Sequence, residues 1–124
     1  GKTCDQIALT RDFLPTLVAA AGGSIPASRK LDGMNLLPYL EKGESPIPRD
    51  VFWRGRRGEV TRKAVRTGDW KRVDNNGERE LYNLKDDPSE TKNRIGEAGV
   101  PDLAPLLSRW EQEVRAPRLK DYPG

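Results

Sequence analysis

Apolar residues recur at helical spacing near the start of the chain, within TRDFLPTLVAAAGG. The stripe consists of Phe13, Leu14, Leu17, Val18 and Ala21. Pro15 fits the first turn of such a helix, where its missing N–H costs nothing, and Gly22 suits the end because glycine tolerates positive φ. The pattern therefore predicts a helix over residues 12–21.

Proline and glycine interrupt the apolar pattern after this helix. The loop SIPASRKLDG leads to MNLLPYLEKG, which predicts a short helix or turn ending at Gly43. Residues 44–49 contain two prolines, each of which biases the residue before it to extended geometry, so this segment is predicted to be a linker. The linker divides a helical first part of the chain from a second part with a different pattern.

From residue 50 onward the pattern predicts short strands. VFWRG is the first, KAVRTGDWKRV contains two strands around a turn at residues 67–69, and ELYNL follows a second turn at DNNGE. Strands joined by such tight turns pair antiparallel in chain order. The expected fold class is therefore α+β, with a small four-stranded antiparallel sheet and a C-terminal helix packed on one face.

Both faces of this sheet carry apolar side chains. Alternate residues of a strand face opposite ways, so Trp53 opposes Phe52, and Tyr82 opposes Leu81. A helix predicted over residues 101–116, opened by Pro101, can cover one face with an apolar stripe. The stripe consists of Leu103, Leu106, Leu107, Trp110 and Val114. The second face needs a cover that this chain does not obviously contain.

The composition indicates that the chain borrows a core from a larger protein. Only 35% of the 124 residues are hydrophobic, against about 45–50% in an ordinary domain, and the mean hydropathy is −0.79. Disorder would also explain this composition, but the three tryptophans and the periodic segments argue against it. The absence of histidine excludes Ser–His and Cys–His catalysis and the commonest zinc ligand, and the single cysteine, Cys4, excludes an internal disulfide.

The sequence shows neither a membrane span nor a signal peptide. No apolar run approaches the length of about 20 residues that a span needs, so no membrane association is expected. The start, GKTCDQIALTRDF, lacks the apolar region of a signal peptide. Because the chain is expected to be a piece of a longer protein, this leaves both a periplasmic and a cytoplasmic location open.

The sharpest polar feature is RGRRGEVTRK at residues 54–63, which is expected to form a loop between the first two strands. Residues 50–76 hold eight basic and four acidic side chains, so positive charge concentrates here. Arg54, Arg56 and Arg57 are the candidate substrate-binding residues, because guanidinium forks suit sulfate, phosphate or carboxylate. The alternative is an ordinary solvated hairpin. Nucleic acid is disfavoured because no aromatic residues interleave with the arginines.

Acidic residues gather in DDPSE, after the fourth strand. Asp87 fits a helix N-cap, Pro88 the first helical position and Glu90 the third, which is the pattern of a capping box. A metal site would need three or more convergent oxygen ligands, and DNNGE lacks the spacing of a calcium loop. We therefore expect a cap and a hairpin turn here, and no metal-binding or catalytic residue in this chain.

The order of several segments resembles the C-terminal end of the type I sulfatases, arylsulfatase-like enzymes of the alkaline phosphatase superfamily. These segments are DFLPTLVAAAG (12–22), LDGMNLLPYL (31–40), RDVFWR (49–54), AVRTGDWKRV (64–73) and ELYNLKDDPSETKN (80–93). The resemblance implies that residues 1–43 are the last helix and loop of a large α/β domain and that 44–49 are a linker. It also implies that 50–116 form the C-terminal subdomain, that 117–124 are a tail, and that the large domain covers the second face of the sheet.

The resemblance also implies what lies elsewhere in such a protein. These enzymes use a formylglycine nucleophile and a calcium ion, both held by the large domain. The cysteine here sits in CDQI, which does not match the formylglycine motif. No cofactor is therefore expected in this chain itself, and calcium and formylglycine are expected in the full-length enzyme.

Two hypotheses of different classes follow. In the first, the chain is the C-terminal portion of a hydrolase of sulfate esters, inactive alone, which completes the fold and walls the substrate cleft. Its partners would be the N-terminal catalytic domain and an anionic sulfate ester, and the chain alone would self-associate through its exposed sheet face. In the second, the chain is a free-standing basic module that binds anionic polymers, either sulfated glycan or nucleic acid.

Overall fold

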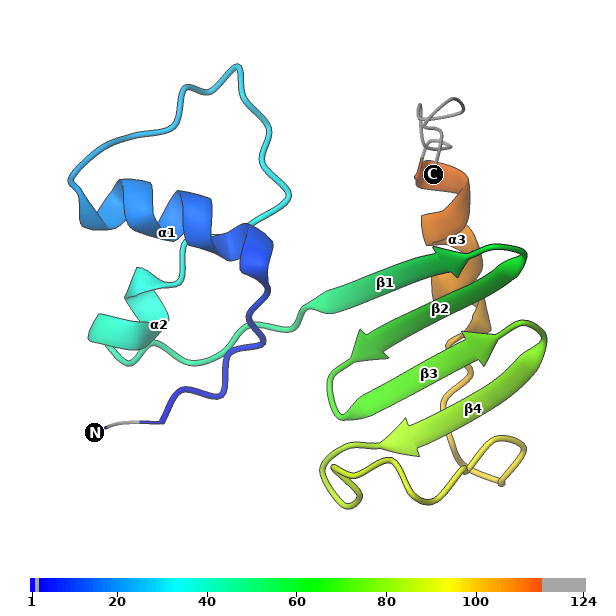
Figure 1. The fold of residues 1–124 in the computed structure, drawn as a ribbon. Helices are drawn as coiled ribbons and strands as arrows, with labels where there is room; N and C mark the ends of the chain where they lie inside the picture. The colour runs from blue at the N-terminus through cyan, green and yellow to red at the C-terminus, as the bar shows by residue number, and fades with distance from the viewer. Residues whose placement is uncertain (2, 115–124) are drawn as a thin grey trace. The chain divides into compact units, whose positions relative to one another are not determined.

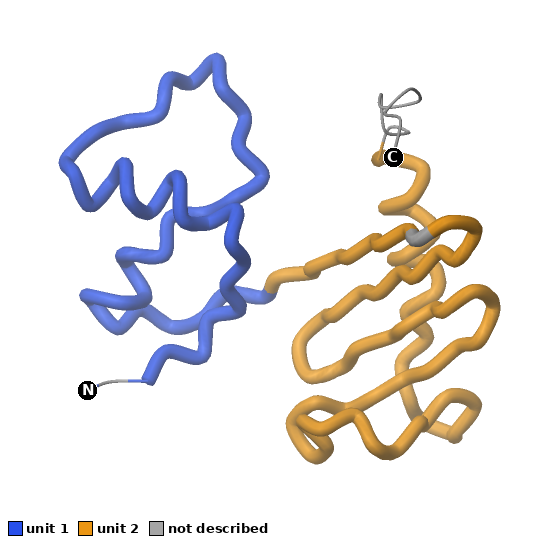
Figure 2. Tube along the Cα trace, viewed as in Figure 1, with its two compact units in different colours: residues 1–48 blue, residues 49–124 orange. Residues whose placement is uncertain are grey.

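The chain folds as two compact units, Gly1–Pro48 and Arg49–Gly124, which Figure 2 distinguishes by colour. The computed structural model describes residue 1 and residues 3–114, apart from the side chain of Arg57. The predicted tail at 117–124 and the last two residues of the predicted C-terminal helix lie outside the described residues. Each unit is described by itself below.

The first unit contains the two predicted helices (Figure 1). A single 3-10 turn, η1 (Thr10–Asp12), leads into α1 (Phe13–Ala20), and α2 (Leu37–Glu41) follows the long loop. Gly22 and Gly43 adopt φ values of 72° and 67° just beyond the two helices, as their predicted roles as helix stops require.

Asp12 joins the start of α1 to the loop that precedes α2. Its side chain is fully buried, its Oδ2 accepts a hydrogen bond from the Leu9 N–H (2.7 Å), and its Oδ1 accepts one from the Met34 N–H (3.0 Å). Gly33 lies so close that a Cβ there would overlap the Arg11 carbonyl oxygen. A small residue and a carboxylate are therefore both required at this point.

The predicted apolar stripe of α1 is largely uncovered. Phe13, Leu14 and Leu17 remain 59%, 58% and 66% exposed. Large apolar side chains on one helix face normally pack against another element. The helix therefore has an apolar face that the described residues do not bury.

The second unit contains the predicted four-stranded sheet. The strands β1 (Asp50–Arg57), β2 (Val60–Thr67), β3 (Trp70–Asn75) and β4 (Glu78–Asn83) pair antiparallel in chain order. Gly68 adopts a φ of 54° in the β2–β3 turn, and Asn76 and Gly77 adopt 52° and 99° in the β3–β4 turn. Two consecutive positive φ values are what a type I′ hairpin turn needs, so the Asn-Gly prediction is confirmed.

The first hairpin corrects the sequence interpretation. The arginine-rich segment is not a loop, because β1 continues through Arg57 and β2 begins at Val60, which leaves only Gly58 and Glu59 in the turn. Arg54 pairs in register with Lys63, and Arg56 with Thr61. The polar end of β1 lacks the apolar alternation by which strands are predicted, and it is a strand because its backbone pairs with β2.

The helix α3 (Ala104–Glu113) covers one face of the sheet and lies behind the strands in Figure 1. Leu107 of this helix and Leu103, the residue just before it, pack with Val65 and Leu81 in a buried cluster. The helix begins at Ala104, whose N–H donates to Asp102 Oδ1 (2.9 Å), so the prediction that Pro101 opens it was wrong. Pro105 is the proline in the first turn, the position that tolerates a missing N–H.

The segment after β4 corrects the predicted capping box. Asp87 does accept backbone hydrogen bonds, from the N–H groups of Thr91 and Lys92 (both 2.8 Å), but no helix follows it. Glu90 has a φ of 55°, which reverses the chain, and its carboxylate binds Lys71 (2.7 Å). The acids of DDPSE therefore stabilise a turn and a tertiary contact.

Asn93 closes the outer edge of β4. Its Oδ1 accepts hydrogen bonds from the N–H groups of Leu81 and Ile95 (both 3.0 Å), and the Arg94 N–H donates to the Leu81 carbonyl (2.8 Å). An edge strand presents unpaired N–H and C=O groups. The returning segment satisfies both groups of Leu81, which explains why ELYNL and the asparagine belong to one motif.

Candidate anion-binding surface

The predicted substrate-binding arginines lie on β1, at the edge of the sheet. Arg54 and Arg56 are two positions apart on the strand, so they share a face of the sheet. The backbone of Arg57 pairs with Val60, and its side chain lies outside the description. The structure therefore places two of the three guanidinium groups.

Arg54 is held against α3 by an aromatic side chain. Its Cζ lies 5.8 Å from the centre of the Trp110 ring, and that ring stacks on Phe52 with centroids 5.2 Å apart and planes 6° apart. The neighbouring Lys63 binds Glu111 of the same helix (2.6 Å). A cation–π contact of this kind does not use up the N–H donors of the guanidinium, which can form a fork to an anion.

Arg56 has a different anchor. Its Nε donates to the carbonyl oxygen of Gly58 (3.0 Å), across the β1–β2 turn. Arg56 also borders a hollow with Gly55, Val60 and Arg62. Arg54 and Arg56 are thus fixed through separate contacts, one on the helix and one at the turn.

The sheet face opposite α3 holds a second basic group that the sequence did not single out as a site. A hollow there is lined by Trp53, Ala64 and Val73, with Arg62 and Lys71 beside them. Arg62 Nε donates to Asn75 Oδ1 (3.0 Å), and Lys71 binds Glu90. Strand alternation could have predicted that these residues share a face only if the lengths of β1 and β2 had been known, because those lengths set the register.

The described residues contain no group of three or more histidine, cysteine, aspartate or glutamate side chains placed to hold a metal ion. Asp87 is ionised more readily than usual, because the Lys92 and Thr91 backbone N–H groups lower the pKa of its carboxyl group. Burial, followed by the charge of Glu80, raises the pKa of Tyr82. These shifts follow from turn and core contacts. Within the described part of the chain, no helix is long and apolar enough to cross a membrane.

Comparison with known proteins reveals sulfatases. No protein-family profile matches the chain. It is 30% identical to the N-acetylglucosamine-6-O-sulfatase of Bacteroides thetaiotaomicron, in an alignment that covers 93% of this chain and 23% of that protein.

Solved structures give the same result. The structure of Ps i-CgsB, also solved with k-i-k-neocarrahexaose, is 26% identical with a TM-score of 0.67 and covers 82% of this chain and 23% of its own. BT1596, a 2-O GAG sulfatase, is 28% identical with a TM-score of 0.52 and covers 82% of this chain and 22% of its own. The chain spans less than a quarter of the length of these relatives, and it corresponds to a C-terminal portion of a sulfatase.

Proposed function

We propose that this chain completes the fold of a hydrolase of sulfate esters and forms part of the wall of its substrate cleft. In this proposal residues 1–43 end the large catalytic domain, 44–49 are the linker, and 50–116 are the C-terminal subdomain. The observation that carries it is the similarity to sulfatases, which extends over 93% of the chain and so includes both compact units. A free-standing basic module is not favoured, because it gives no reason for this similarity.

The chemistry belongs to the catalytic portion. In such an enzyme a formylglycine would supply the nucleophile and calcium would polarise the sulfate group. The described residues offer no set of ligands for an ion, and Cys4 does not stand in a formylglycine motif. The chain on its own is therefore proposed to be inactive, and its contribution is structural and electrostatic.

Arg54, Arg56 and Arg57 are the proposed contacts with the anionic substrate. Arg54 supports this role, because a cation–π contact with the Trp110 ring restrains its guanidinium before any ligand arrives. A pre-positioned donor loses less side-chain freedom on binding than a free one. The name of the Bacteroides relative suggests a sulfated amino sugar as the first substrate to test.

The test uses the complete parent enzyme with aryl sulfates and with N-acetylglucosamine 6-sulfate. Replacing each arginine by alanine removes a charge-assisted hydrogen bond of about 1.5–3 kcal/mol, so we expect kcat/KM to fall about 10-fold to 100-fold for an engaged residue. Arg54→Lys keeps the charge over Trp110 but loses the fork. Arg79→Ala, an equal loss of charge on the exposed part of β4, is the matched control.

The two parts of the proposal fail in different ways. Unchanged kcat/KM in all three alanine variants would show that the arginines do not contact the substrate in the cleft. The intact parent protein could instead hydrolyse phosphate or phosphonate esters and no sulfate ester. That result would reject the proposed reaction but leave the fold assignment in place.

A further inference from the structure

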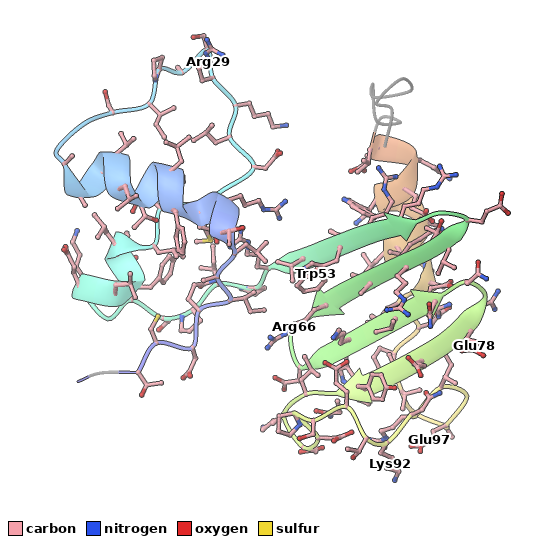
Figure 3. The ribbon with its side chains drawn as sticks, in the orientation of Figure 1. Arg29, Trp53, Arg66, Glu78, Lys92 and Glu97 are labelled. Atoms are coloured by element: carbon pink, nitrogen blue, oxygen red, sulfur yellow. The ribbon has the colours of Figure 1, made fainter. Side chains whose placement is uncertain are left out.

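The sheet face opposite α3 is closed at one end of β1 and open at the other. Val51, near the start of the strand, is fully buried. Trp53, labelled in Figure 3, lies two positions further along the same face and is 42% exposed. Val60, which pairs with the last residue of β1, is 41% exposed. The open part of this face is therefore the end toward the β1–β2 turn.

A glycine opens the floor of this end. Gly55 lies on the same face as Trp53 and pairs in register with Arg62. A Cβ at Gly55 would meet no heavy atom within 4 Å apart from those of its two neighbours in the chain. Glycine weakens a strand interior, and it often marks a place that a ligand or another backbone approaches closely. The missing side chain therefore leaves space for a ligand against the strand.

Two hollows adjoin at this glycine. The first has a volume of about 290 Å³ and is bordered by Trp53, and the second has a volume of about 310 Å³ and is bordered by Arg56. Both are bordered by Gly55 and Arg62, and we call them together the Gly55 depression. Small-molecule sites usually have volumes of about 300–1,000 Å³. Each hollow therefore suits a small group, such as a single sugar ring.

Two arginines give the Gly55 depression its positive charge. Arg62 Nε donates to Asn75 Oδ1 (3.0 Å), and Arg56 Nε donates to the carbonyl oxygen of Gly58 (3.0 Å). A guanidinium has five N–H donors, and each of these bonds uses one of them. The bonds restrain both side chains, and the remaining donors can form a fork to an anion.

The other charged residues nearby do not cancel this charge. Lys71 also borders the Gly55 depression, but Glu90 binds its ammonium group (2.7 Å). Glu59 lies in the β1–β2 turn, and Glu78 and Glu80 lie on β4, which β2 and β3 separate from β1. None of these three acids is among the described residues that border the two hollows. The depression therefore presents positive charge beside an exposed indole ring.

We propose that the Gly55 depression binds a saccharide ring that carries a carboxylate or a sulfate group. The hydrocarbon face of the ring packs on Trp53, because an indole offers a broad apolar surface. The anionic group takes the remaining donors of Arg62 or Arg56. One aromatic side chain suits one ring, whereas a nucleic acid strand needs a series of them. The inference rests on the proposed function and deepens it, because it makes the substrate an anionic oligosaccharide whose neighbouring residue occupies this depression.

The test measures hydroxyl-radical oxidation of the three tryptophans in the complete parent protein by mass spectrometry. The anionic probes are tetrasaccharides of heparin and of chondroitin sulfate, and the neutral probe is chitotetraose. Trp53 should be oxidised in the free protein, and a saturating anionic probe should slow its oxidation about fivefold, because a bound ligand buries most of its own surface and that of its site. Chitotetraose should protect it much less. Trp70 and Trp110 are internal controls, because both already pack against the buried cluster.

Variants of the complete protein link this protection to the Gly55 depression. Gly55→Val fills its floor and suits a strand, because β-branched residues favour extended backbone, and Arg62→Gln removes a cation. Each should raise the dissociation constant of the anionic probes about tenfold, as for the loss of a charge-assisted hydrogen bond. Arg79→Gln, an equal loss of charge on the exposed part of β4, is the matched control. An equal effect of Arg62→Gln and Arg79→Gln would indicate unspecific charge attraction and contradict the site.

Two results of the oxidation test would overturn the proposal. Protection of Trp53 in the free complete protein would show that another part of that protein covers the depression, and equal oxidation with and without both anionic probes would show that neither binds there. Enzyme assays on the same protein separate this inference from the proposed function. Hydrolysis of a sulfate ester without protection of Trp53 would keep the reaction and reject the site. Protection by an anionic probe without hydrolysis of any sulfate ester would keep the site and reject the reaction.

Discussion

Replacing Asn93 by alanine tests whether the segment after β4 holds the edge of the sheet. The amide side chain accepts hydrogen bonds from the Leu81 and Ile95 N–H groups (both 3.0 Å) and donates a longer one to the Arg79 carbonyl (3.3 Å). Alanine removes all three bonds and leaves the Leu81 N–H without this acceptor. Alanine can keep the same backbone conformation, so the loss in the free energy of unfolding measures the contribution of the Asn93 side chain.

The expected magnitude follows from the surroundings of each bond. Leu81 is only 3% exposed, so its N–H would lose a partner that water replaces poorly, at a cost of about 1–2 kcal/mol. The other two bonds are exposed, and water compensates for most of their loss. We therefore expect Asn93→Ala to lower the free energy of unfolding by about 2 kcal/mol, which is roughly a 30-fold change in the equilibrium constant.

Urea unfolding followed by tryptophan fluorescence is the appropriate assay. All three tryptophans lie in the unit Arg49–Gly124, so the signal reports that unit and not the first one. Asn93→Asp is the matched control, because it keeps the acceptor oxygen while it exchanges the exposed donor to Arg79 for a charged oxygen that water can solvate, and it should cost less than half as much. A free energy for Asn93→Ala within about 0.5 kcal/mol of the parent, the usual range for an inert surface site, would refute the reasoning.

Three other predictions concern separate parts of the chain. Gly33→Ala should destabilise the first unit by about 1–3 kcal/mol, because the added Cβ would overpack the contact with Arg11. Hydrogen-exchange protection of the Met34 amide should fall, and unchanged protection would contradict this close contact. Trp110→Ala should cost about 3 kcal/mol in urea unfolding, and Trp110→Phe clearly less because a ring can still stack on Phe52. Asp87 has a folded pKa below its usual 3.8, so its stabilising effect is complete above that value and is lost as the pH falls through the folded pKa. Asp87→Asn should therefore flatten the decline of the urea midpoint in acid, and parallel pH profiles would exclude this contribution.

Local chemistry was sufficient to predict much of the second unit. Asn76 and Gly77 tolerate the positive φ values of a tight hairpin turn, which depends on the residues themselves and not on their surroundings. The alternation of Phe52 with Trp53 likewise identified two apolar faces before any partner was known. The long reach of β1 was missed, because its polar end becomes a strand through backbone pairing with β2.

The candidate site depended more strongly on tertiary contacts. Arg54 meets Trp110 across more than fifty residues of sequence, and no local pattern relates the two. Glu90 looked like the third residue of a capping box, but Lys71 holds its carboxylate and a positive φ turns the chain away from a helix. Asn93 in turn bonds the same segment to the edge of β4, a contact that lies outside the reach of a local capping pattern.

The sequence by itself determined the elements, their antiparallel order and the shortage of apolar residues, since turn residues and apolar spacing act over a few positions. Only the tertiary structure decided which cations are anchored and which face of the sheet stays open. The physical reason is that burial and side-chain pairing depend on residues brought together by folding. Trp53 belongs to a strand pattern and Trp110 to a helical stripe, and neither pattern distinguished their environments, yet one lies open beside a hollow and the other packs under an arginine.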